Sequence, residues 1–219
     1  MCGRYALYTT PISLAEKLKI PPPPFDLKAR YNIAPGTWIL GVHYSEPQSK
    51  AVFDQFWWGF RPNGAGANAP QPINAKAENL ETSRYFRGAF HRHRCLIPAN
   101  GWYEWQNLLS GKQPYYITHT QKEPLFFAGV WEVDADQELC CAIVTEPARG
   151  ALERIHPRMP VVLDESAWLA WLDPERRDRD AIRSGIHHLP ANLLTTWPVS
   201  TSVNRAANDD ASLIKRADG

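Results

Sequence analysis

The sequence predicts an α+β fold in which β-strands dominate, on three observations. Many short stretches are rich in β-branched and aromatic residues, whereas few show the periodicity of an amphipathic helix. The 219 residues include 19 prolines and 13 glycines, which favours stiff loops between short elements. Hydrophobic residues make up 44% of the chain, enough for a substantial core. We therefore expect one compact domain over 1–219, with a mixed or antiparallel sheet forming a barrel-like core and a few flanking helices.

Local signals define the first elements. Residues 3–8 predict a short strand. A helix is expected to begin after Thr10, a good N-cap residue, with Pro11 in its first turn, and to continue to residue 20. The four prolines at 21–24 cannot extend that helix and predict a stiff polyproline segment.

The rest of the chain alternates between strands and a few helices. Strands are predicted at 38–44, 51–58, 73–78, 94–97, 101–105, 114–119, 125–133 and 138–145. Helices are expected at 82–92, 149–155 and 164–172. The segment 61–72 is rich in Gly, Pro and Asn and predicts an irregular loop, and about 205–219 are expected to form a loosely held tail.

Charge and composition restrict the partners. The net charge is only +1, but basic clusters at 84–94 and 149–158 predict a groove that follows phosphates, with solvated helix faces as the alternative. The chain contains no run of membrane-spanning length, and the N-terminus lacks signal-peptide features, so we expect a cytoplasmic, monomeric protein without a membrane partner. The four cysteines show no metal-ligand spacing, so neither zinc nor another cofactor is expected, and Cys140 and Cys141 are expected to be buried.

Cys2 directly follows the initiator methionine, and a small residue at this position permits removal of Met1. The mature chain would then begin with both a free α-amine and a thiol. Such an aminothiol can attack an aldehyde to form an imine and then close a five-membered thiazolidine ring. An α-amine has a lower pKa than a lysine, which raises its neutral fraction at pH 7 by roughly several hundredfold. The alternative is that a cysteine at position 2 is incidental.

Two strand-like motifs carry candidate polar groups. In INAKAEN, a period of two places Asn74, Lys76 and Glu78 on one face, which suggests either a site wall or an exposed strand face. In GWYEW, the same alternation sends Trp102 and Glu104 to one side and Tyr103 and Trp105 to the other. We expect the aromatic surroundings to raise the pKa of Glu104, which suits it to proton transfer near neutral pH.

The segment IHPRMP places two further candidates in a proline-stiffened loop. His156 is a candidate second acid or base, although a single histidine is often structural. Arg158 could pair either with a phosphate or with a structural carboxylate.

In combination, these motifs resemble one family over nearly the whole chain. The matching segments are MCGRY (1–5), YNIAPG (31–36), WGF (58–60), INAKAE (73–78), SR (83–84), GWYEW (101–105), IHPRMP (155–160), PVS (198–200) and VN (203–204). They are similar to the SOS-response-associated peptidase (SRAP) family of abasic-site processing proteins.

This resemblance implies a β-rich fold with a basic groove for single-stranded DNA, and a thiazolidine crosslink between mature Cys2 and the ring-opened sugar of an abasic site. It implies that Asn74 positions the Cys2 amine and the sugar, that Glu104 is the acid/base, and that His156 assists ring opening and crosslink reversal. An associated lyase activity and self-removal of Met1, from which the word peptidase would derive, are further implications. The expected DNA-binding residues are Arg4, Pro35, Lys76, Arg84, Trp105 and Arg158.

Two features depart from the family pattern. Lys76 stands where members carry arginine, which keeps the charge but loses bidentate phosphate geometry. The loop 61–72 contains no aromatic residue, whereas members often place a tryptophan there.

Two other functions account for part of the sequence. An N-terminal-nucleophile glutamine amidohydrolase would also use Cys2 but does not require GWYEW or IHPRMP. A non-catalytic module that binds single-stranded DNA would use the aromatic and basic residues and would not need Cys2.

Overall fold

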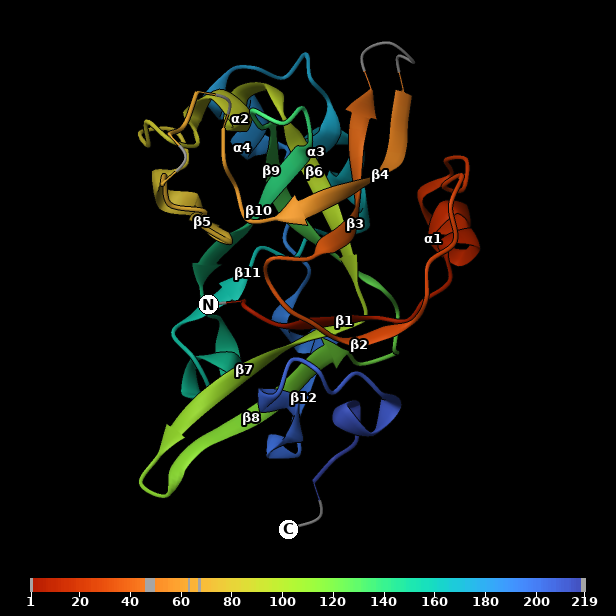
Figure 1. Ribbon diagram of the computed structural model, residues 1–219, viewed down its shortest axis with the longest axis vertical. Coiled ribbons are helices and arrows are strands. Elements are labelled where there is room, and N and C mark those ends of the chain that lie inside the picture. Colours follow the sequence, from red (N-terminus) through yellow and green to blue (C-terminus); the bar gives the residue numbers. More distant parts are fainter. Residues whose placement is uncertain (1, 46–49, 63, 67, 218–219) are drawn as a thin grey trace.

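A computed structural model describes residues 2–45, 50–62, 64–66 and 68–217, which form a β-rich domain of two sheets (Figure 1). The first sheet has the strand order β12-β8-β7-β1-β2, and the second follows β11-β10-β4-β3-β6-β9 with β5 paired to β10. The strands of the first sheet are β1 (Tyr5–Leu7), β2 (Arg30–Ile33), β7 (Gly101–Leu108), β8 (Gly111–His119) and β12 (Leu194–Pro198). Those of the second are β3 (Trp38–Ser45), β4 (Lys50–Trp58), β5 (Asn74–Lys76), β6 (Arg94–Ala99), β9 (Leu125–Val133), β10 (Leu139–Pro147) and β11 (Arg158–Pro160).

The second sheet closes into a ring because β10 pairs both with β4 and with β9. The β10–β4 and β10–β5 pairings are parallel, whereas the other pairings in this sheet are antiparallel. The expected mixed sheet is therefore present. The expectation of a single barrel-like sheet is met only in part, since the strands form two sheets and one of them closes on itself.

The helices are few and short. The α-helices are α1 (Pro11–Leu18), α2 (Arg87–Arg92), α3 (Trp168–Leu172) and α4 (Arg179–Ser184). Single 3₁₀ turns are η1 (Ala77–Asn79), η2 (Gly150–Arg154), η3 (Glu165–Ala167), η4 (Ala191–Leu193), η5 (Thr201–Asn204) and η6 (Ala211–Ile214). In the described ranges, no helix combines the length and the apolar character needed to cross a bilayer.

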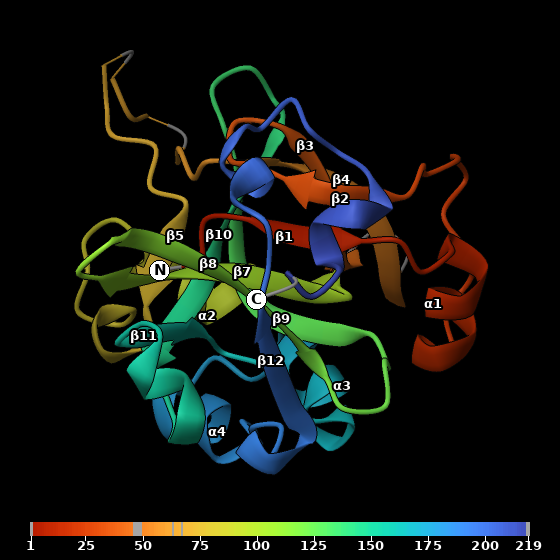
Figure 2. The same ribbon diagram turned by 90° about the horizontal axis from the view of Figure 1, so that it is seen from below.

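Apolar side chains fill the space between the two sheets and also the outer face of the first sheet. Trp102 on β7 is fully buried in the main core, together with Tyr5 of β1 and Trp58 of β4. The next residue, Tyr103, belongs to a second cluster on the opposite face, where the C-terminal segment with its 3₁₀ turns packs on the sheet (Figure 2). The alternation predicted for GWYEW is therefore present in β7.

Several elements differ from the sequence prediction. The helix expected at 82–92 is reduced to α2, because residues 80–86 consist mostly of turns. The helix expected at 149–155 is instead the 3₁₀ turn η2, and the helix expected at 164–172 begins with the 3₁₀ turn η3 and continues as α3. Gly150 adopts φ +60° at the start of η2, a conformation incompatible with an α-helix. The strands β2, β11 and β12 were not predicted, since such short strands depend on tertiary pairing, and the six-residue helix α4 was not predicted either.

The strand expected at 73–78 ends at Lys76 and turns into η1. Glu78 therefore does not share a strand face with Asn74 and Lys76, which corrects the grouping expected from INAKAEN. Ala75 is buried against the core as the alternation requires. Glu78 instead approaches Arg158 of β11.

The described part of the C-terminal segment is attached more firmly than the sequence suggests. Leu213 is buried in the second apolar cluster. The amide of Ala217 donates to the carbonyl of Pro198 at 2.9 Å, and Val199 forms a bridge with Arg216. The segment therefore packs on the outer face of the first sheet.

Candidate active site at the junction of the two sheets

The position of Cys2 follows from the pairing of β1 with β7. These strands are antiparallel with Tyr5 opposite Trp102, and the amide of Tyr103 donates to the carbonyl of Arg4 at 2.9 Å. Extending this register toward the N-terminus brings the chain alongside Glu104. Cys2 is fully buried there. Burial raises the pKa of its thiol well above the ordinary value, and the charge of Glu104 raises it further.

Asn74 connects the second sheet to this N-terminal segment. It lies on β5, opposite Ile143 of β10, and its Nδ2 donates to the carbonyl of Cys2 at 3.0 Å. Its Oδ1 is buried and has no hydrogen-bond partner among the described residues. The amide thus fixes Cys2 through one atom and leaves a buried acceptor for another donor.

Glu104 is the buried carboxyl group of the site. Its side chain extends from β7 on the same face as Trp102, and the residue is 4% exposed. Burial raises its pKa from 4.5 to about 7, and the positive charge of the N-terminal amine acts in the opposite direction. A carboxyl group with this pKa populates both its acid and its base form at neutral pH.

His156 lies in the loop between η2 and β11, and its Nδ1 is 3.9 Å from Oε2 of Glu104. The amide of Arg158 donates to the same Nδ1 at 3.0 Å. Burial lowers the pKa of His156, and nearby positive charges lower it further. The same Nδ1 lies 3.1 Å from the carbonyl oxygen of Arg158, so it accepts from the Arg158 amide in one tautomer and donates to the Arg158 carbonyl in the other.

Some of the side chains expected to contact DNA are exposed, whereas others are hydrogen-bonded to the protein itself. Lys76 and Arg84 are exposed, and Pro35 is half-buried in the turn between β2 and β3. Trp105 is half-buried and donates from Nε1 to Oδ1 of Asn204 at 2.7 Å. Arg4 donates from Nη1 to Asn32 and to Val203.

Arg158 is held by a carboxylate of the protein itself. Both of its terminal nitrogens bond to the carboxylate of Glu78, and Nη2 also donates to the carbonyl of Thr145 at 2.7 Å. Of the two roles that the sequence left open for Arg158, the geometry favours the structural one.

Two supporting residues were not found from the sequence. Thr145 is fully buried on β10 and receives Arg158, and Gln106 on β7 donates to the carbonyl of Arg154 at 2.8 Å. Together they hold the loop that carries His156 against both sheets. Neither residue has a sequence signal that separates it from ordinary strand positions.

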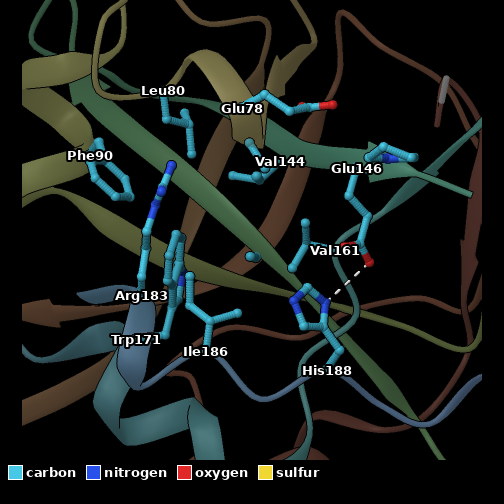
Figure 3. Close-up of a pocket in the computed structure, with 13 residues that line it drawn as sticks. Glu78, Leu80, Phe90, Val144, Glu146, Val161, Trp171, Arg183, Ile186 and His188 are labelled. Atoms are coloured by element: carbon cyan, nitrogen blue, oxygen red, sulfur yellow. Dashed lines mark hydrogen bonds and ion pairs between the residues drawn. The ribbon is translucent and has the colours of Figure 1, made fainter. Parts of the chain in front are cut away.

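A separate cavity of about 370 Å³ lies on another face of β10, beneath α2, α3 and α4 (Figure 3). Its walls are mostly apolar, and at one edge Nδ1 of His188 lies 3.1 Å from Oε1 of Glu146. Cys2, Asn74, Glu104 and His156 do not line it. The candidate site is therefore the junction of the sheets and not this cavity. Among the described residues, no group of three or more His, Cys, Asp or Glu side chains is placed to hold a metal ion.

The junction of the two sheets therefore holds the buried Cys2, a carboxyl group with a pKa of about 7 and an imidazole whose pKa is lowered. Residues 1–206 match the family described as SOS response associated peptidase (SRAP). The chain therefore belongs to the SRAP family.

Similar proteins cover nearly the whole chain. It is 34% identical over 227 residues to the abasic site processing protein YedK of Escherichia coli, covering 98% of this chain and 99% of that protein. It is 30% identical over 224 residues to the abasic site processing protein YoqW of Bacillus subtilis, covering 98% and 99% of the two chains. A crystal structure of a protein from Bacteroides thetaiotaomicron aligns with a TM-score of 0.85 at 19% identity, over 99% of this chain and 100% of that one, and shows the shared fold.

Proposed function

We propose that this protein processes abasic sites in single-stranded DNA by forming a thiazolidine crosslink between mature Cys2 and the ring-opened deoxyribose. The observation that carries the proposal is the burial of Cys2 near Glu104, a buried carboxyl group whose pKa is about 7 and whose charge acts on the Cys2 thiol. Similarity to two abasic site processing proteins supports the choice of substrate. Removal of Met1, by the protein itself or by another enzyme, supplies the free amine.

Crosslinking begins when the neutral Cys2 amine adds to the sugar aldehyde and gives a carbinolamine. Protonated Glu104 donates a proton to the carbinolamine hydroxyl, which leaves as water, and an iminium ion forms. The Glu104 carboxylate then takes the proton of the Cys2 thiol. The sulfur attacks the iminium carbon, the electron pair returns to nitrogen, and the ring closes with the loss of one water overall. Glu104 ends the cycle protonated, as it began.

His156 and Asn74 assist these steps. The closed sugar opens when the proton of its C1 hydroxyl passes through Glu104 to the ring oxygen. In the tautomer that accepts from the Arg158 amide at Nδ1, the Nε2–H of His156 stabilises the charge that develops on that oxygen. The buried Oδ1 of Asn74 accepts a hydrogen bond from the Cys2 amine and directs its lone pair at the aldehyde. The same groups working in reverse would release the sugar, and elimination from the iminium ion would give a lyase activity.

We infer that Lys76, Arg84, Pro35 and Trp105 line the path of the DNA. The two cations are exposed, and Trp105 offers an aromatic face close to Glu104 in sequence. Arg4 and Arg158 contribute less to DNA affinity in this proposal, since their guanidinium groups already bond to protein atoms.

The test uses the purified protein, with loss of Met1 checked by intact mass, and a single-stranded oligonucleotide that carries one abasic site. We expect an adduct that survives a denaturing gel, maps to Cys2 by peptide mass spectrometry, and is absent both with intact DNA and with Cys2→Ala. Cys2→Ser is expected to give at most a reversible imine or strand cleavage.

Three outcomes would contradict the proposal. An adduct of normal yield with Cys2→Ala would remove Cys2 as the nucleophile. No adduct from wild type, together with release of ammonia from glutamine, would favour the amidohydrolase. Tight binding without any adduct, unchanged in Cys2→Ala, would favour a non-covalent DNA-binding module.

A further inference from the structure

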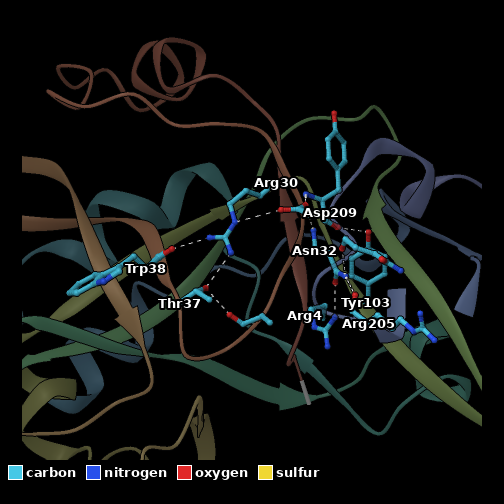
Figure 4. A network of polar contacts seen from close by, with 11 residues as sticks. Arg4, Arg30, Asn32, Thr37, Trp38, Tyr103, Arg205 and Asp209 are labelled. Atoms are coloured by element: carbon cyan, nitrogen blue, oxygen red, sulfur yellow. Dashed lines mark hydrogen bonds and ion pairs between the residues drawn. The ribbon is translucent and has the colours of Figure 1, made fainter. Parts of the chain in front are cut away.

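A cluster of polar contacts, from the buried Asn32 to the exposed Asp209, ties the C-terminal segment to β2 (Figure 4). Asn32, which is 2% exposed, is its centre. Its Nδ2 lies 3.2, 3.0 and 2.7 Å from the carbonyl oxygens of Val203, Arg205 and Asn208. An amide nitrogen has two protons, so three acceptors use its full donor capacity. Its Oδ1 accepts from Nη1 of Arg4 at 2.8 Å.

Asp209 provides the second set of contacts. Its Oδ1 accepts from the backbone amides of Tyr31 and Asn32, the latter at 3.0 Å. Its Oδ2 is 3.9 Å from Nε of Arg30, whose guanidinium also reaches Oγ1 of Thr37 at 3.4 Å. The contacts therefore extend from the C-terminal segment to the turn that contains Pro35. We call residues 203–209 the C-terminal clasp.

The cluster reaches the immediate neighbours of both reacting side chains. Arg4, which Asn32 holds, follows Cys2 by two residues, and its carbonyl accepts from the amide of Tyr103. The hydroxyl of Tyr103 donates to the carbonyl of Tyr31 at 2.6 Å, and Tyr103 directly precedes Glu104. One strand, β2, thus fixes the segment of Cys2 and the segment of Glu104 relative to each other.

We propose that Asn32 and Asp209 are positioning residues for the reaction at Cys2, and that the C-terminal clasp holds the nucleophile and its acid/base in register. This inference rests on the proposed crosslinking function. The contacts of the clasp reach the segments of Cys2 and Glu104 through Arg4 and Tyr103.

The apolar contacts of the C-terminal segment separate this role from simple attachment. Val203 and Leu213 are buried with Tyr103 on the outer face of the first sheet, so burial alone keeps the segment on the domain. The directional bonds of Asn32 and Asp209 add a fixed register to that attachment. Misplacement of reacting groups by about 1 Å can reduce a rate by about 100-fold.

The experiment compares full-length Asp209→Ala with wild type at a temperature where both are folded. Three quantities are measured: the crosslinking rate at saturating abasic-site DNA, the affinity for the same oligonucleotide without the lesion, and the rate of Cys2 alkylation by iodoacetamide without DNA, mapped by peptide mass spectrometry. We expect crosslinking to slow by about 10- to 100-fold, alkylation of the buried thiol to accelerate by about 10-fold, and affinity to change by less than about twofold.

Matched variants separate position from stability. Asp209→Asn keeps an oxygen acceptor for both amides and is expected to restore both rates to near wild type. Asn32→Asp keeps the acceptor for Arg4 but loses the donor to the three carbonyls, so it is expected to behave like Asp209→Ala. Asp210→Ala is the control in the same segment, because Asp210 caps η6 through Ser212.

The inference would be overturned if Asp209→Ala unfolded at a lower temperature yet kept wild-type rates of crosslinking and alkylation. It would also be overturned if Asp210→Ala changed both rates as much as Asp209→Ala. If wild type forms no adduct, the proposed function fails, whereas the alkylation rates still decide whether the clasp holds Cys2.

Discussion

At the scale of single residues, the pKa of Glu104 connects the chemistry of the site to the stability of the fold. The folded-state pKa of about 7 lies above the ordinary 4.5, so the folded protein binds a proton that the unfolded chain has already lost between these pH values. Below pH 4.5 the carboxyl group is protonated in both the folded and the unfolded state, so its ionisation does not change the free energy of unfolding. As the pH rises from 4.5 through 7, stability is lost.

Glu104→Gln should therefore become more stable relative to wild type as the pH rises through this window. The difference between 4.5 and about 7, at roughly 1.4 kcal/mol for each pH unit, corresponds to about 3 kcal/mol above pH 7. Urea unfolding of both proteins at pH 4.5, 6 and 8 measures it. The same variant should slow crosslinking more than it weakens DNA binding, because an amide cannot transfer the proton. If the difference in unfolding free energy between Glu104→Gln and wild type did not change with pH, the pKa of Glu104 would not be raised in the folded protein.

Within the candidate site, the sequence predicted on which side of its strand Glu104 lies, but it did not predict which residue binds Arg158. Alternation in GWYEW was sufficient to place Glu104 beside Trp102 and away from Tyr103. The partner of Arg158 could not be predicted, because Glu78 is 80 residues away in sequence and approaches only after β5 turns into η1. The roles proposed for Asn74 and His156 stay predictions until they are tested.

At the scale of elements, long strands rich in apolar residues were predicted best. The bounds of β9 match the predicted 125–133, and α1 begins at the expected cap, where Thr10 accepts from the amide of Ser13. The missed strand β2 has four residues and is defined by its pairing with β1. Its existence depends on the tertiary fold, and no local preference of its sequence could reveal it.

Arg158 of β11 is bonded to other parts of the protein, whereas Arg84, in the segment before α2, is exposed, and this difference gives a prediction at the scale of elements. Arg158 of β11 joins η1 to β10, so Arg158→Ala should destabilise the fold by roughly 1–3 kcal/mol. Arg84 is exposed, so Arg84→Ala should change stability by less than about 0.5 kcal/mol but lower the salt dependence of DNA binding by about one phosphate contact. Urea unfolding and binding titrations at several salt concentrations distinguish the two. A loss of salt dependence in Arg158→Ala equal to that in Arg84→Ala would show that Arg158 leaves Glu78 to bind phosphate.

At the scale of the whole molecule, a net charge of +1 means that DNA must be attracted by local clusters of cations. We predict that binding to single-stranded DNA is independent of base sequence, since phosphates and a sugar aldehyde carry no base information. With two to four phosphate contacts, the logarithm of the binding constant should fall with the logarithm of salt concentration at a slope of roughly −1.4 to −2.8. Fluorescence anisotropy with oligonucleotides of different composition measures both. A flat salt dependence, or a strong preference for one base, would contradict this mode of recognition.

The junction of the two sheets also sets the order in which the site can be completed during synthesis. Along the chain, Cys2 precedes Asn74, Glu104, His156 and Asp209, so it leaves the ribosome long before them. Domains fold as units once enough of the chain has emerged. In the proposed reaction, the aminothiol of a nascent chain therefore lacks Glu104 until residue 104 has emerged and lacks the C-terminal clasp until residue 209 has emerged. We therefore expect a chain truncated before residue 104 to carry the proposed nucleophile without its proposed acid/base.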